Sequence, residues 1–155
     1  MRNGSGTTPL FFVTSRDDER SSILWVVGEL DAHTVAAFEA ELERLVPKCR
    51  SLIVELSSCS FVSAAALGSL VRFRGHLPGG AVALVTESSH VAKVLRIAGL
   101  ERQFPLFNDL VEALAAVAET SARTDTLTRR RGRGIVHRLP ARSASLSELG
   151  LVLEG

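Results

Sequence analysis

The chain has 155 residues, 46% of them hydrophobic and 5% aromatic, and it carries a formal net charge of +1. This length suits one domain with a tail, and the charge argues against a general attraction to nucleic acid or to a membrane surface. Residues 1–10 lack the apolar stretch of a signal peptide, and no run approaches the ~20 apolar residues of a membrane span. We therefore expect a soluble, cytoplasmic protein that binds no membrane.

Cys49 and Cys59 are the only cysteines of the chain. Two thiols do not make a disulfide framework, and these two show no metal-ligand spacing with the four scattered histidines. We expect reduced thiols, no metal site and no cofactor.

The first part of the chain predicts a hairpin followed by a helix. Strands are expected at 10–16 and 21–30, on either side of the polar turn "DDER". Residues 31–46 place apolar side chains on one helical stripe, and Pro47 ends that helix. The stripe consists of Val35, Phe38, Leu42 and Leu45.

The middle of the chain alternates strands with helices. The apolar run 51–56 is typical of a strand buried on both faces, and 81–87 is a second such strand. Between them, 64–74 predicts a helix with Gly75 available as its C-terminal cap.

The last elements are two helices and a short edge strand. One helix starts at Ser88 or Ser89 and stops at Gly99. The segment 103–107 contains a proline, which suits an edge strand, and 109–119 predicts the final helix.

Together these elements predict an α/β fold with a mixed, mostly parallel sheet of about four to five strands covered by about four helices. The first strand is expected to be antiparallel. We predict a flexible N-terminus at 1–9, the domain at 10–120, and a basic, disordered tail at 121–155.

The predicted tail holds seven arginines against three acidic residues. Its "RRRGRG" run, 129–134, could hold phosphates, but no aromatic residues are interleaved, so a solvated tail is favoured over a nucleic-acid partner. The segment 145–153 opens with a capping-box pattern, Ser145 and Glu148, and is a weak candidate for a docking segment.

Sequence signatures of catalysis are missing. The chain has no phosphate-binding loop, no dinucleotide fingerprint, no zinc-protease motif and no nucleophile elbow. Glu29, Asp31 and His33 gather at the end of the second predicted strand and could form an acid–base group. Because no nucleophile accompanies them, we favour a surface rim that meets a partner, and we expect no enzyme.

Several ordered motifs carry a family resemblance. They are "GELD" at 28–31, the apolar strand with "LS" before the turn, "FVSAAALG" at 61–68, and "VLRIAGLERQFPLF" at 94–107. Over roughly residues 10–118 the chain resembles the STAS domain and, more narrowly, bacterial anti-sigma factor antagonists.

The resemblance implies a partner-switching function. In this family the unphosphorylated form binds an anti-sigma factor that is also a serine kinase, which releases the sigma factor, and phosphorylation of a serine at the turn breaks the complex. The family's turn reads D-S-[ST]-G-L-G, with the serine after the aspartate as acceptor. Here the turn runs from Ser63 to Gly68, and Ala64 stands at the acceptor position. Alanine has no hydroxyl, so Ala64 cannot be phosphorylated.

Ser63 and Asp31 each have two interpretations. Ser63 could cap the following helix or serve as an alternative phosphosite, and the cap is favoured. Asp31 matches the family's aspartate and could contact the partner or take a turn or cap role for the following helix. The residues expected to meet the partner are Asp31, Ser63, Ala64, Ala65 and Leu67. Ser57, Ser58 and Ser60, just upstream, are interpreted as strand-end or loop hydroxyls.

Two functions remain open from the sequence. The first is an anti-sigma factor antagonist-like protein that binds an anti-sigma factor of the serine-kinase type, either as a constitutive antagonist or as a decoy. The alternative is a non-phosphorylated STAS scaffold or ligand-sensing module in a larger signalling assembly.

Overall fold

A computed structural model describes residues 12–17, 21–45, 47–77 and 81–131. The elements follow one another as β1 (Phe12–Asp17), β2 (Ser21–Leu30), α1 (Val35–Leu45), β3 (Ser51–Glu55), β4 (Cys59–Val62), α2 (Ala64–Arg74), β5 (Val82–Val85), α3 (Ser89–Ile97), the 3-10 turn η1 (Leu100–Arg102), β6 (Leu106–Phe107) and α4 (Leu110–Arg131).

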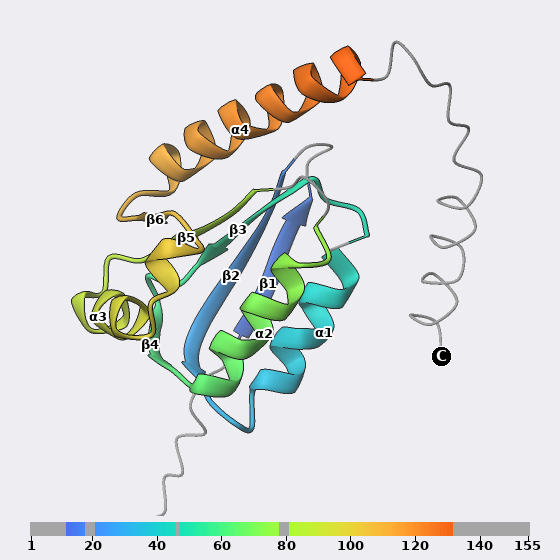
Figure 1. The fold of residues 1–155 in the computed structure, drawn as a ribbon. Coiled ribbons are helices and arrows are strands. Elements are labelled where there is room, and N and C mark those ends of the chain that lie inside the picture. The colour runs from blue at the N-terminus through green and yellow to red at the C-terminus, as the bar shows by residue number, and fades with distance from the viewer. Residues whose placement is uncertain (1–11, 18–20, 46, 78–80, 132–155) are drawn as a thin grey trace, which may run out of the picture.

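The sheet has the order β1-β2-β3-β5-β6, and β4 pairs with β2 outside this path. β1 is antiparallel to β2, while the pairs β2–β3, β2–β4, β3–β5 and β5–β6 are parallel. This confirms the predicted α/β class with a mixed, mostly parallel sheet (Figure 1).

Two cores lie on opposite faces of the sheet. The larger core packs the predicted stripe of α1, Phe38, Leu42 and Leu45, against the sheet together with residues of α2 and α3. The smaller core packs Ala113 and Val117 of α4 onto β3 and β5. In Figure 1, α1 and α2 lie side by side on one face, and α4 crosses the other.

The strand β4 was not predicted as a separate element. The sequence predicted one strand at 51–56, but after a turn at Ser57 and Ser58 the chain forms a second strand, which pairs with the end of β2. A strand of four residues that begins with a cysteine and a serine has little of the β-branched pattern on which strand prediction relies.

The prediction of disorder from residue 121 is wrong for 121–131, because α4 continues to Arg131. This extension is fastened to the start of β3. Ser121 Oγ and Ser51 Oγ share a hydrogen bond of 2.6 Å, and Arg50 forms an ion pair with Asp125. Residues 1–9 and 132–155, which include the candidate docking segment, lie outside the described residues.

Two glycines that were expected to end helices behave differently. Gly99 has φ 71°, the left-handed conformation that favours glycine and stops α3. Gly75 has φ −62°, so its backbone does not require glycine. Among the helices that the structure describes, none is long and apolar enough to cross a membrane.

Candidate functional site

The turn before α2 is fixed to the end of β2 by backbone hydrogen bonds. Gly28 has φ 98° and lies at a register shift of β2, where its N–H donates to Ser58 O at 3.0 Å. Beyond the shift, Leu30 pairs with Val62, and the Ser63 N–H donates to Leu30 O at 2.8 Å. The first turn of α2 therefore stands directly beside the end of β2.

Ser63 is the N-cap of α2, as the favoured interpretation predicted. Its backbone is extended, with φ −80° and ψ 160°, and its Oγ accepts the Ala66 N–H at 3.3 Å. The Leu67 N–H donates to the Ser63 carbonyl at 3.1 Å. The cap satisfies helix N–H groups that have no partner within the helix.

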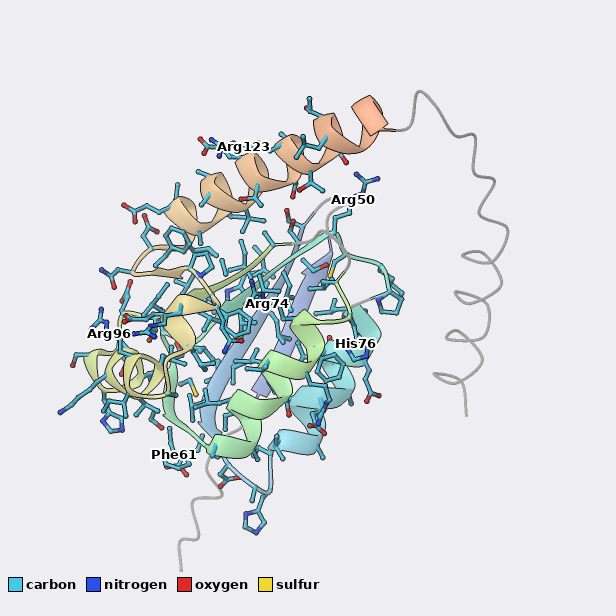
Figure 2. All side chains as sticks on the ribbon, viewed as in Figure 1. Arg50, Phe61, Arg74, His76, Arg96 and Arg123 are labelled. Carbon is cyan, nitrogen blue, oxygen red and sulfur yellow. The ribbon has the colours of Figure 1, made fainter. Side chains whose placement is uncertain are left out.

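The exposed side of this turn is apolar. Phe61 of β4 is 44% exposed and Val71 of α2 is 39% exposed. Ala64, Ala65 and Gly68 lie exposed between them. We call these five residues the turn surface; Figure 2 shows Phe61 at the end of the molecule where α2 begins. Because contiguous apolar surface marks interaction sites, the turn surface is the candidate for such a site.

The predicted partner contacts do not all face solvent. Ala64 and Ala65 are exposed, whereas Leu67 is half-buried and packs against the larger core. Ala66, between them, is fully buried. The sequence missed Phe61, Gly68 and Val71 as surface residues. The last two could have been found, because they follow Ala64 at i+4 and i+7 on one helix face.

Asp31 organises the turn between β2 and α1. Its Oδ1 accepts the backbone N–H groups of His33, at 2.8 Å, and Thr34, at 3.1 Å. These hydrogen bonds, the one from His33 first, lower the pKa of the Asp31 carboxyl. Asp31 thus has the turn role that was one of its interpretations, while its contact with a partner stays a prediction.

The arrangement of Glu29, Asp31 and His33 is that of a surface rim. Glu29 is exposed, and the His33 side chain is 94% exposed. The His33 Nδ1 lies 3.8 Å from Asp31 Oδ1, which already accepts two backbone N–H groups. A general acid needs a raised pKa, whereas that of Asp31 is lowered.

A polar network joins α2 to α1 behind the turn surface. The buried Ser69 hydroxyl donates a hydrogen bond to Glu39 Oε1, and the Arg72 guanidinium also bonds to this oxygen. The hydrogen bond from Ser69, followed by that from Arg72, lowers the pKa of Glu39. The network fixes the orientation of α2 relative to α1 and so supports the turn surface.

The serines upstream of the turn support loops, as predicted. Ser57 Oγ accepts the Glu87 N–H at 3.2 Å, and Ser60 Oγ donates to Gly28 O at 3.4 Å. Cys59 is buried, and burial raises the pKa of its thiol. Such a thiol is poorly reactive, because the thiolate is the nucleophile.

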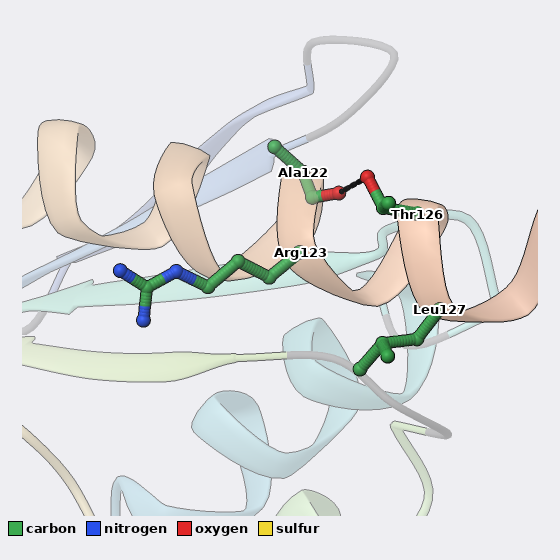
Figure 3. Close-up of a pocket in the computed structure, with 4 residues that line it drawn as sticks. All are labelled: Ala122, Arg123, Thr126 and Leu127. Atoms are coloured by element: carbon green, nitrogen blue, oxygen red, sulfur yellow. Dashed lines mark hydrogen bonds between the residues drawn. The ribbon is translucent and has the colours of Figure 1, made fainter.

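One pocket lies elsewhere, along the second half of α4. It is lined by Ala122, Arg123, Thr126 and Leu127 (Figure 3). Within the described part of the chain, no three His, Cys, Asp or Glu side chains gather as metal ligands would.

Comparison with known proteins gives a family match and similar structures. The family model of the STAS domain matches residues 13–113. No curated protein matches the chain.

Several solved structures share the fold. An anti-sigma factor antagonist from Mycobacterium paratuberculosis has 26% identity and a TM-score of 0.65, covering 70% of this chain and 95% of its own. The unphosphorylated anti-sigma factor antagonist SpoIIAA has 21% identity and a TM-score of 0.58, covering 83% and 100%. The phosphorylated form of SpoIIAA, a cell fate determinant of Bacillus, has 20% identity and a TM-score of 0.55, covering 70% and 99%.

Proposed function

Because the chain belongs to the STAS domain family, we propose that it is a cytoplasmic anti-sigma factor antagonist-like regulator. It binds an anti-sigma factor of the serine-kinase type through the turn surface and so influences sigma-factor-dependent transcription. The observation that supports this most is the turn surface itself, five apolar residues exposed at a helix start with no catalytic group among them. A binding surface without chemistry suits a protein that acts by occupying its partner.

The proposal includes the loss of the usual switch. Phosphorylation adds about −1.5 to −2 charges and three acceptor oxygens. At a helix start such a charge is tolerated by the free N–H groups, so the helix survives while an apolar partner is rejected. Ala64 cannot accept a phosphate, and the binding form persists in the presence of an active kinase.

Ser63 is the neighbouring hydroxyl, but its oxygen already accepts the Ala66 N–H. Asp31 lies at the same rim, since the Ser63 N–H bonds to the residue before it. In the proposed complex, Asp31 contributes charge at the edge of the interface, while Ala64 and Ala65 lie at its centre.

The first test is affinity capture by the tagged full-length protein from its native lysate, with mass spectrometry of the bound proteins. Ala64→Asp brings a charge into the turn surface, and Ser89→Asp makes the same change at the matching position of α3. We expect a kinase-like anti-sigma factor to bind the unmodified protein and the Ser89→Asp control, and to be lost with Ala64→Asp. Stable assemblies that lack any kinase-like protein would instead support the scaffold alternative.

The second test asks about the switch. With the captured kinase and ATP, we expect the natural chain to take up no phosphate and Ala64→Ser to take it up and release the partner. Phosphate that appears on the natural chain and vanishes with Ser63→Ala would contradict the proposal of a persistent binding form.

A further inference from the structure

One face of the sheet is only partly covered by the described helices. α4 lies over β3, β5 and β6, and its core includes Ile23 of β2 at the border. Trp25 and Val27 follow Ile23 at alternate positions and so point to the same face as it does. Both are half-buried, and neither belongs to either core. We call Trp25 and Val27 the open face.

The apolar side of α4 also continues beyond its support. Ala113 and Val117 are buried against the sheet, and Leu127 falls on the same side of the helix. Yet Leu127 is 63% exposed, and it lines the described pocket together with Arg123 (Figure 3). A helix face that stays apolar past its support indicates a further element that packs there.

The chain leaves α4 within reach of the open face. Ser121 is bonded to Ser51, and Ser51 is paired with Ser21, the first residue of β2. α4 ends at Arg131 and 24 residues follow, 132–155. The 13 residues between Arg131 and Ser145 can span up to about 40 Å. The path to cover is about 15 Å of helix from Ser121 to Arg131 plus about 20 Å along β2 from Ser21 to Val27.

The segment 145–153 is rich in apolar residues, which suits an apolar surface such as the open face. Its five apolar residues are Leu146, Leu149, Leu151, Val152 and Leu153. Residues 145–155 contain Glu148 and Glu154 and neither lysine nor arginine, whereas the end of α4 carries Arg123 and the arginines 129–131. Opposite charges on a short tether favour an intramolecular contact, because the effective concentration of a tethered segment is high.

We propose that residues 145–153 dock on the open face and on Leu127 of the same chain. The docked segment covers Trp25 and Val27, and its carboxylates lie toward the basic end of α4. This surface is on the opposite side of the sheet from α1 and α2. The turn surface thus stays free when the segment is bound, and the docking is independent of the proposed partner.

Trp25 allows a direct test, because the chain has one tryptophan and no tyrosine. The measurement is the emission wavelength of Trp25 and its quenching by acrylamide in the full-length protein. Leu149→Asp places a charge within the segment, and Leu139→Asp is the matched control in the same tail outside the segment. Circular dichroism checks that each variant keeps its helices.

We expect Leu149→Asp to shift the emission to the red and to raise the quenching constant about two-fold, because a covered indole becomes accessible. Leu139→Asp should match the unmodified protein. The proposal is overturned if Leu149→Asp leaves Trp25 unchanged, or if Leu139→Asp has the same effect. It is also overturned if protection of Trp25 fades on dilution, since the segment of a second copy would then be the occupant.

Discussion

The helices α2 and α3 begin alike and present different surfaces. Each starts after a serine whose Oγ accepts the N–H three residues on, at 3.3 Å in both cases. The first eight residues of α3 expose Ser89, His90, Lys93 and Arg96, as a solvated helix does. Those of α2 expose Ala64, Ala65, Gly68 and Val71. The same local folding rules therefore produced one helix start with a polar exposed side and one with an apolar exposed side.

The inner sides of the two helices provide the test with the largest expected effect. Leu70 of α2 and Leu95 of α3 are both almost completely buried. Leu70→Ala and Leu95→Ala should each lower the free energy of unfolding by about 2–5 kcal/mol, through lost apolar contact and a residual cavity. Urea unfolding measures both. If Leu70→Ala lowered the free energy of unfolding far less than Leu95→Ala, α2 would be only loosely attached to the core. The two helices would then differ on their buried sides as well.

The next largest expected effect is the loss of stability on removing a helix cap. Ser63→Ala and Ser88→Ala each remove one cap hydrogen bond and should cost about 1 kcal/mol. Thermal unfolding of the two variants should give similar shifts. A negligible loss for Ser63→Ala alone would mean that its hydroxyl is kept for a reason other than capping.

Gly68→Ala tests the exposed side of α2, and here we expect the free energy of unfolding to rise and not to fall. The φ of Gly68 is not positive, and an added Cβ would meet nothing within 4 Å. Gly68→Ala should therefore raise the free energy of unfolding by up to about 1 kcal/mol, because glycine is a poor helix former. The same variant should weaken capture of the partner if the partner approaches the helix backbone closely. Higher stability with unchanged capture would place the interface away from Gly68.

The smallest expected effect comes from the charged side chains that attach each helix to a neighbouring element. Glu39 ties α1 to α2 and its pKa is lowered, mainly by the Ser69 hydrogen bond. Its carboxylate therefore stabilises the fold above the ordinary pKa of 4.5, and this contribution is lost as the pH falls below that value. The difference in unfolding free energy between the natural chain and Glu39→Gln should narrow from pH 7 to acid.

The matched control is Glu101→Gln. Glu101 pairs with Arg96 of α3, and both side chains are more than half exposed. Such pairs contribute little, so this variant should show no comparable dependence on pH. If the difference in unfolding free energy narrowed in the same way for both variants, its cause would be a destabilisation of the whole fold at low pH and not the α1–α2 network.

The sequence was informative where one rule decides the structure. The spacing of Phe38, Leu42 and Leu45 predicted the buried side of α1, and all three are fully buried. The apolar run that became β3 was expected to be covered on both faces, and Ser51 to Val54 are buried. The cap at Ser63 also followed from residue type alone.

The sequence was less informative where distant residues decide. β4 forms because the end of β2 offers a free edge at Leu30, which no local pattern around Cys59 reveals. The second half of α4 is polar, and its place depends on Ser51 and Arg50, some 70 residues earlier. The turn surface needed the fold as well, since exposure of Phe61 depends on what lies over β4.

The shift at Gly28 has a consequence for how this protein can change. β2 pairs with β3 through Ser21–Trp25 and with β4 only through its last three residues, and the shift lies between Gly28 and Glu29. The stretch from Cys59 to Arg74 therefore joins the sheet outside the pairing of β2 with β3, while its buried side belongs to the larger core. The exposed positions of the turn can therefore differ in sequence while β1, β2 and β3 keep their alignment, because the pairing of β2 with β3 ends at Trp25, before the shift.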